Sequence, residues 1–429
     1  MPATPGGLVR RFALLSALRW FPIGLTIPVN VLLMQARGLD LAVIGGLYAI
    51  YGIVTIALEL PTGGLADVVG RRTVLVAASI ATTVSMLVAA VAQDVPLFAL
   101  AMVLGAIGRA LGSGPLDAWY VDATHALDPE ASVRHGLARG QAAEALALGL
   151  GAVIGGLLPA ICLAIWPSLA SGPIIGLSVP VLLAAAMTAA NAIAILLVVH
   201  ERRPAWVGVR AIAGGVPSTI REGLRLGFGD PMLRRLMVRA GLLGVVLAGI
   251  ELLAPGTFAG LLGGESQASR VYGIFAAAAF GASAAGSALA PAVARRLGSA
   301  RAAAIASFAA GGAILLVASP ILALVGAGYV AVYLLLGVGG PLTSELLHGR
   351  VEAAQRTTLL SVESLALQVG GVVANLSLGT IVVATSLGWG FACIAAAMVA
   401  GGALLLTRPF RQAAATEDRA RSVPAHGAG

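Results

Sequence analysis

Twelve separate stretches of this sequence are each long and apolar enough to cross a lipid bilayer as a helix. A helix needs about 20 mostly apolar residues to span the hydrocarbon core. The stretches lie near residues 12–35, 42–60, 73–92, 97–119, 140–163, 177–199, 240–261, 271–293, 302–319, 321–344, 358–385 and 388–407. Each is continuously apolar rather than alternating, which favours helices over the strands of a membrane barrel. The sequence therefore predicts an all-α integral membrane protein with twelve transmembrane helices.

The composition agrees with a protein whose outer surface faces lipid. Hydrophobic residues make up 59% of the 429 residues, and charged residues only 11%. A soluble domain typically has about a quarter of its residues charged. Most of the surface of this chain therefore has lipid rather than water as its solvent.

Every basic residue of the chain is an arginine, and these arginines are distributed unevenly between the two sets of loops. Nearly all fall at the termini or in even-numbered loops. Only Arg37 and Arg270 fall in the opposite set, and Arg19 and Arg109 lie inside spans. Because arginine-rich loops stay in the cytoplasm, both termini are predicted to be cytoplasmic. The net charge of +8 then marks a face for anionic membrane lipid, so we expect no nucleic-acid partner.

The lysine-free, alanine-rich composition favours a bacterial source, so the expected location is the inner (plasma) membrane of a bacterium. The two cysteines, Cys162 and Cys393, are isolated from each other in or beside apolar spans. They offer neither the spacing of metal ligands nor a disulfide framework. We expect a monomer without metal or cofactor.

A long arginine-rich connection after the sixth span divides the chain into two halves. A distant internal repeat supports this division: aligning Gly70, in the loop after the second span, with Gly298, in the loop after the eighth, places Arg295 where the first half has Asp67. Two six-span halves with a substrate site near the membrane midplane are typical of many secondary transporters. The expected domains are an N-terminal six-helix bundle at 1–200, a cytoplasmic linker at 201–239, a C-terminal six-helix bundle at 240–408 and a disordered cytoplasmic tail at 409–429.

A polar stretch, ELPTGGLADVVGRR at residues 59–72, separates the second span from the third. Its proline and glycines allow a sharp bend and a close approach of backbones. Asp67 and the neighbouring Arg71 and Arg72 place opposite charges at the ends of this short loop. Such an arrangement suits a latch between helix ends better than a catalytic centre.

This loop resembles the hallmark of the major facilitator superfamily of secondary transporters, G-x-x-x-D-[RK]-x-G-R-[RK]. It matches at Gly63, Asp67, Gly70, Arg71 and Arg72, and departs where a valine replaces the basic residue after the aspartate. The resemblance extends over essentially the whole chain through the twelve spans and the central linker. It implies the fold of that family, in which two six-helix bundles expose a central cavity to each side of the membrane in turn.

The resemblance also implies a role for the loop. In the family, the aspartate and arginines of the motif engage a carboxylate near the cytoplasmic end of the fourth span and the facing half, and this network holds the outward-open state. Asp117, in GPLDAWYVD, is placed to be that carboxylate, and Asp122 is the alternative. We therefore expect a conformational latch formed by the loop motif and Asp117.

Two further motifs resemble elements of proton-coupled members of the family. The fourth span contains GRALGSG, in which Arg109 corresponds to the arginine of an R-x-x-x-G element. The fifth span contains ALGLGAVIGG, which resembles the antiporter motif G-P-x-x-G-G at Gly151, Gly155 and Gly156, with an alanine in place of the proline. Both resemblances favour export by proton antiport, as in the drug/proton antiporters associated with multidrug resistance.

Charged side chains inside spans are candidates for proton coupling or for the substrate cavity, because each costs at least ~2.5–3.5 kcal/mol at mid-bilayer and usually faces a cavity or a partner. By analogy with the family, Arg109 would modulate a nearby carboxylate; a structural ion pair is the alternative. Glu251, in the middle of the seventh span, is the first candidate for an acid that binds substrate or protons; a hydrogen bond to helix backbone is the alternative. Glu144 and Glu363 lie near cytoplasmic span ends, where a wetted helix end or an inter-helix pair explains them equally well.

Polar residues recur at helical spacing along one face of two spans. They include Gln368 and Asn375 in the eleventh span, and Tyr48 and Tyr51 in the second. Either face can line a central cavity, or can serve as polar packing between helices. The sequence favours neither explanation.

Together these features predict a secondary transporter that exports a small amphipathic molecule in exchange for protons. A proton-coupled or facilitative importer is the nearest alternative, and a non-transporting membrane receptor or regulator is a more distant one. An enzyme is not expected, because the sequence has no P-loop, no H-E-x-x-H motif and no clustered histidine and cysteine ligands. The expected partners are a small-molecule substrate, protons and membrane lipid.

Overall fold

The computed structural model describes residues 5–63, 65–201, 225, 227–350, 353–408 and 410. Within these ranges the chain is helical and has no strand. Twelve of the described helical segments are long and apolar enough to cross a membrane. The predicted all-α fold with twelve membrane-spanning helices is therefore confirmed.

The first six spans form one half of the molecule. Its elements are α1 (Pro5–Thr26), α2 (Asn30–Ala36), α3 (Leu41–Gly63), α4 (Leu65–Val69), α5 (Arg71–Val91), α6 (Val95–Gly112), α7 (Pro115–His125), α8 (Arg134–Ile165), the short 3-10 helix η1 (Pro167–Ala170) and α9 (Ser178–Val198). The first span is broken into α1 and α2, and the fourth into α6 and α7. The second break falls at Gly114, whose φ of +90° suits glycine, and Pro115 then starts α7.

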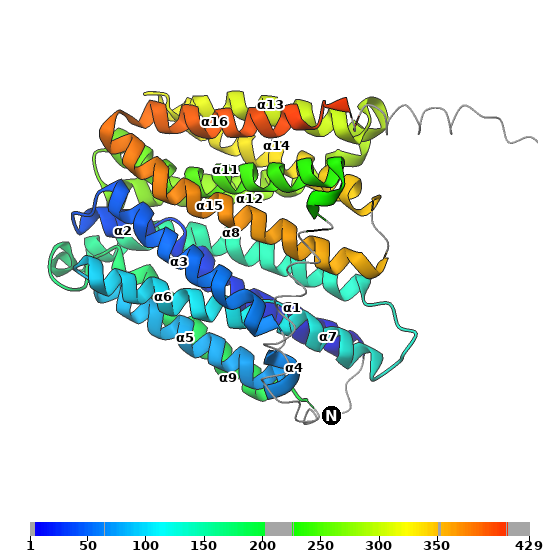
Figure 1. The fold of residues 1–429 in the computed structure, drawn as a ribbon. Coiled ribbons are helices and arrows are strands. Elements are labelled where there is room, and N and C mark those ends of the chain that lie inside the picture. Colours follow the sequence, from blue (N-terminus) through cyan, green and yellow to red (C-terminus); the bar gives the residue numbers. More distant parts are fainter. Residues whose placement is uncertain are drawn as a thin grey trace, which may run out of the picture.

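The last six spans form the second half, which lies above the first in the view of Figure 1. Its elements are α11 (Pro231–Leu262), α12 (Glu265–Leu297), α13 (Ser299–Val317), α14 (Leu322–His348), α15 (Ala353–Ala384) and α16 (Leu387–Leu404). The boundary between linker and second half differs from the predicted one, because residues 231–239 already belong to α11. Asp230 fixes this start, since its carboxylate accepts the backbone N–H groups of Met232 and Leu233 at 2.8 and 2.9 Å.

Most of the predicted linker and most of the predicted tail lie outside the described residues. Of residues 202–230 the structure describes 225 and 227–230, and beyond 408 it describes 410. The expected disorder of the tail therefore stays a prediction.

The two halves share one hydrophobic core at one end of the molecule, here called the closed end. That core combines buried side chains of α2 and α3 with those of α11, α12, α14 and α16. At the other end, the open end, each half has a core of its own, one around Trp119 and Tyr120 and the other around Met232 and Leu236. α1 begins and α16 ends at the open end, on the right in Figure 1. In the described residues the halves therefore share a core at one end and have separate cores at the other.

Glycines allow the closest approach of the halves at the closed end. On α8, a β-carbon at Gly156 would collide with the backbone carbonyl oxygen of Ser269 on α12. On α3, a β-carbon at Gly45 would collide in the same way with the carbonyl oxygen of Asn375 on α15. Small residues let membrane helices bring their backbones together. The two halves are thus joined by backbone-to-backbone contacts along α8–α12 and α3–α15.

Candidate functional site

Arg109 and Glu251 face each other from opposite halves of the molecule. Arg109 lies on α6, in the middle of the broken fourth span, and Glu251 lies in the middle of α11. Both side chains are exposed, and the guanidinium is within electrostatic range of the carboxylate. No ion pair joins the two in the described part of the chain. Two opposite charges, both accessible and not joined by an ion pair, thus lie within electrostatic range of each other on helices of different halves.

Tyrosine rings surround these two charges. Tyr51 on α3 lies beside the Arg109 guanidinium, and its ring also packs near Gly105, one turn earlier on α6. Tyr48 on α3 and Tyr333 on α14 are both half-buried and both close enough to Glu251 to interact with it electrostatically. The structure therefore brings Tyr48, Tyr51, Arg109 and Glu251 together, while Tyr333 is a neighbour that the sequence did not single out.

A second charged group lies toward the open end of the first half. Arg19 on α1 is in electrostatic range of Asp117 on α7 and Glu144 on α8. Its guanidinium lies against Gly112 on α6, where a β-carbon would be 3.1 Å from one of its nitrogens. Asp117 and Glu144 also interact with each other, so two acids share one arginine. The structure places Glu144 in this group rather than beside Glu251.

The second half contains a related arrangement. Arg239 on α11 is 7% exposed, and within the described residues it has no ion pair or hydrogen bond. Its electrostatic partner is Glu363 on α15, which in turn is near His348 on α14. The sequence around Glu144, EALALG, is repeated around Glu363 as ESLALQ. Each half thus places an arginine of its first helix within electrostatic range of a glutamate of its fifth span.

The polar stripe on α15 faces α3 of the other half. The Gln368 side-chain amide donates a hydrogen bond to the Glu59 carboxylate on α3, and the backbone of Asn375 meets Gly45. Gln368 and Asn375 therefore belong to the contact between the halves. For Gln368, a contact between helices explains the stripe better than a cavity wall does.

We predict that Gln368→Glu weakens the contact between α3 and α15. Two carboxylates about 4 Å apart repel by between about 1 and 4 kcal/mol for effective dielectric constants of about 80 and 20. The unfolding temperature of the purified protein should fall, and the reciprocal double variant Glu59→Gln/Gln368→Glu should recover most of the loss. Gln368→Leu, which removes the hydrogen bond without adding charge, is the matched control and should lower the unfolding temperature less. Equal losses in the single and reciprocal variants would contradict the pairing.

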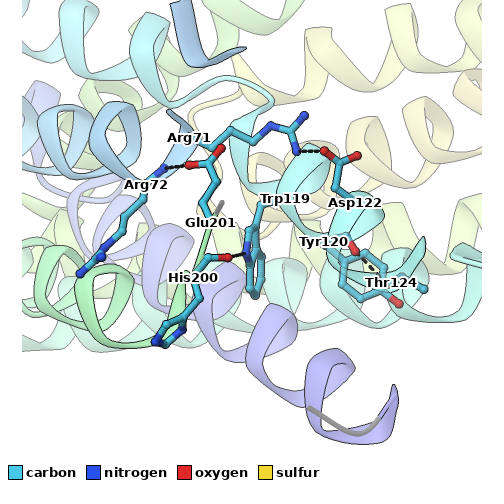
Figure 2. A network of polar contacts seen from close by, with 8 residues as sticks. All are labelled: Arg71, Arg72, Trp119, Tyr120, Asp122, Thr124, His200 and Glu201. Carbon is cyan, nitrogen blue, oxygen red and sulfur yellow. Dashed lines mark hydrogen bonds and ion pairs between the residues drawn. The ribbon is translucent and has the colours of Figure 1, made fainter. Parts of the chain in front are cut away.

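At the end of the loop between the second and third spans, Arg71 and Arg72 contact Asp122 and Glu201, as Figure 2 shows. Gly70, with a φ of +100°, turns the chain from α4 into α5. An Arg71 guanidinium nitrogen forms an ion pair with the Asp122 carboxylate on α7 at 2.5 Å. Arg72 donates to the Leu196 carbonyl oxygen of α9 at 2.6 Å, and its backbone N–H donates to Glu201 at 3.3 Å.

The partner of Arg71 is thus the carboxylate that the sequence offered as the alternative. Asp117, the first choice, lies with Arg19 and Glu144 instead. Gly63 ends α3 and Asp67 lies within α4, but the Asp67 side chain is outside what the structure describes. The three contacts of Arg71 and Arg72 described above are all made to residues of the first half.

We predict that Asp122→Asn destabilises the protein only slightly. The Asp122 side chain is 66% exposed, and exposed ion pairs contribute about 0.2–1 kcal/mol. The unfolding temperature should fall by no more than a few degrees, and less at high salt because the attraction is screened. Glu130→Gln, at an exposed acid of the following loop, is the control. A loss well above ~1 kcal/mol would show that Asp122 carries more of the loop's attachment than one exposed ion pair can.

The glycines of the antiporter-like motif serve two contacts of α8. Gly151 and Gly155 face α1, where β-carbons would collide with the carbonyl oxygens of Phe21 and Leu25. Gly156 faces α12 of the other half. The structure therefore relates this motif to close helix packing, both inside the first half and between the halves.

Comparison with known proteins agrees with this architecture. The family model of the Major Facilitator Superfamily matches residues 12–344, well over half of the chain. The chain is a member of the major facilitator superfamily. No curated protein matches its sequence. Among solved structures, the nucleoside transporter NupG superposes with a TM-score of 0.74 at 13% identity, covering 94% of this chain and 100% of NupG.

Two other solved structures share the fold. A bacterial homologue of the human lysosomal transporter Spinster, in an inward-facing and unoccupied conformation, has a TM-score of 0.68 at 16% identity over 99% of this chain and 100% of that one. The peptide transporter POT in complex with sulfate has a TM-score of 0.68 at 14% identity, over 94% and 95% of the two chains. At these identities the structural similarity establishes the fold of this protein. The substrate has to be inferred from the residues of this chain itself.

Sequence reasoning missed the buried Arg239 because it ended the linker at that residue. The signal was present: the repeat of EALALG as ESLALQ relates Glu144 to Glu363, and it would have directed attention to an arginine in the first helix of each half. Tyr333 was missed although Tyr329 lies four residues before it on the same span, at helical spacing. Its role depends on α14 and α11 being adjacent, which the chain order does not reveal.

Proposed function

We propose that this protein is a proton-coupled secondary transporter that exports a small amphipathic molecule. Glu251 is the acid that carries the proton, and Arg109 of the facing half influences its proton affinity. One observation supports this most directly: two exposed, opposite charges face each other across the two halves at membrane depth without forming an ion pair. Charged groups inside a membrane protein typically mark proton or substrate pathways.

The side of the membrane that the open end faces sets the proposed direction of transport. Arginine-rich loops gather there, so by the positive-inside rule we assign it to the cytoplasm. In the observed state Glu251 exchanges its proton with cytoplasmic water and the cavity accepts substrate from the cytoplasm. After the halves rock, Glu251 takes up a proton from outside as substrate leaves. One proton then enters for each release of substrate, which is antiport.

The contacts between the halves support such a rocking motion. The shared core and the glycine contacts lie at the closed end, and the two separate cores lie at the open end. The loop containing Arg71 and Arg72 lies at the open end, where the family resemblance assigns it the role of holding the opposite state. We therefore propose that the loop motif acts as a latch when the open end closes.

We also propose a membrane, an oligomeric state and an orientation for the protein. We place the protein in the plasma membrane of a bacterium, as a monomer with both termini in the cytoplasm. The similar solved structures bear the names of nucleoside and peptide transporters, so neither substrate nor direction follows from the fold. The antiporter-like glycines and the arginine of the fourth span favour export.

A flux experiment in inverted vesicles tests the proposal. A ligand-stabilisation screen on the purified protein first supplies compounds that bind. An imposed gradient with the interior acidic should then drive uptake of a binding compound into the vesicles, and a protonophore should abolish this uptake. Uptake that is indifferent to the protonophore would contradict proton coupling, and uptake driven only when the gradient is reversed would indicate an importer.

A further inference from the structure

The charges between the halves also restrict the chemical class of the substrate. Arg109 belongs to the first half and Glu251 to the second, and both are exposed. They interact electrostatically but are not in ion-pair contact in the described residues. A substrate that binds between the halves must therefore meet one cation on one wall and one anion on the other.

The free-energy cost of removing charged groups from water determines which class of substrate can bind between Arg109 and Glu251. When the halves close around a ligand, each charge that loses water without gaining a partner is strongly unfavourable. A purely cationic ligand would satisfy Glu251 and leave Arg109 without an anionic partner. A purely anionic ligand would do the reverse, and an uncharged ligand would satisfy neither as well. A molecule with both an anionic and a cationic group satisfies both walls.

The walls next to the two charges are aromatic. Tyr51 lies beside Arg109, and Tyr48 and Tyr333 lie within electrostatic range of Glu251, so that both halves contribute rings. All three are half-buried and retain exposed surface. Tyrosine rings offer apolar faces for stacking and hydroxyls for hydrogen bonds. The body of a ligand held here is best matched by an aromatic group.

We propose that the substrate is a small aromatic zwitterion, whose anionic group binds Arg109 and whose ammonium group binds Glu251. This inference rests on the proposed function, because it assigns the substrate of the same site. A substrate of this kind also accounts for the exchange of substrate for protons. The ammonium group and the proton compete for Glu251, so substrate binding from the cytoplasm releases the proton there. Because the ligand contacts both halves, it favours their closure around it.

Three phenylalanine compounds with the same aromatic body test the proposal. They are phenylalanine, which is zwitterionic, its C-terminal amide, which is only cationic, and its N-acetyl derivative, which is only anionic. The dipeptide phenylalanyl-phenylalanine extends the series to a wider separation of the charges. Binding of each is measured by calorimetry and by thermal stabilisation of the purified, full-length protein.

At least one of the two zwitterions should bind at least about tenfold more tightly than either singly charged compound, as expected for a charge-assisted hydrogen bond. In Arg109→Gln the advantage over the amide should disappear, and Arg109→Lys should restore part of it. In Glu251→Gln the advantage over the N-acetyl compound should disappear. Glu345→Gln, at an exposed acid that accepts a hydrogen bond from Ser299 at 2.8 Å near the open end, is the control and should bind as the wild type does.

Two results would overturn the inference. If the amide or the N-acetyl compound binds as tightly as the zwitterions, the substrate need not carry both charges. If neither zwitterion binds, an aromatic amino-acid-like substrate is excluded. Either result leaves the proton-driven flux experiment unaffected, because that experiment uses whichever compounds the screen supplies.

Discussion

Gly156→Leu is expected to shift the protein strongly away from the observed state, toward one in which the closed end is open. A side chain at this position would collide with the backbone of α12, which cannot rotate aside as a side chain can. Overpacking of a tight contact costs about 1–3 kcal/mol, which changes the ratio of two conformations roughly 5- to 150-fold. Spin labels at Trp166, after the end of α8, and at Gln267, in the first turn of α12, should show the increased separation.

Gly149→Leu is the matched control for this prediction. It lies on the same helix, and a β-carbon there would meet nothing within 4 Å. Its label distances should equal those of the wild type. If Gly156→Leu also keeps the wild-type distances while remaining folded, the α8–α12 contact does not determine which end is closed.

Glu251→Gln is expected to abolish accumulation driven by a proton gradient. Glutamine has nearly the shape of glutamate, but its side-chain amide does not bind or release a proton near neutral pH. In inverted vesicles, substrate accumulation against its gradient should fall to the level of protein-free vesicles, while downhill exchange of substrate continues at a reduced rate. The split between lost coupling and retained exchange separates a proton carrier from a residue needed only for folding.

The control for Glu251→Gln is Glu345→Gln at the open end. It removes an acid of the same type, whose hydrogen bond from Ser299 lies within the second half. Accumulation should respond to the proton gradient as in the wild type. Gradient-driven accumulation that survives in Glu251→Gln would assign coupling to another acid, with Glu144 and Glu363 the next to be examined.

The number of spans could be predicted from the sequence because continuous apolar runs of this length have few other uses. The breaks within spans were less visible, since hydropathy does not distinguish one long helix from α6 followed by α7. The start of α11 was missed for a related reason: its first turns carry Arg234 and Arg235, and an apolar window excludes them although Asp230 and Pro231 begin the helix there.

The candidate site was predictable where a single residue type stood out against its surroundings. Arg109 and Glu251 are conspicuous because charge is rare at that depth. Their mutual proximity was not predictable, because it depends on how two distant halves face each other. The same limit applies to the choice between Asp117 and Asp122, which lie about one and a half turns apart on α7 and differ in which arginine each approaches. Nor does a sequence state which end is closed, because it must encode both states.

The seal between the halves is made from main chain against main chain, with only hydrogen atoms of glycine at the narrowest points. Because glycine is the smallest residue, no substitution at these positions can bring the two backbones closer together, and any larger side chain pushes them apart. Random substitutions at these positions should yield many variants biased toward the form in which the closed end is open, and almost none that close more tightly. A selection for tighter closure would have to act elsewhere, on the lining of the open end.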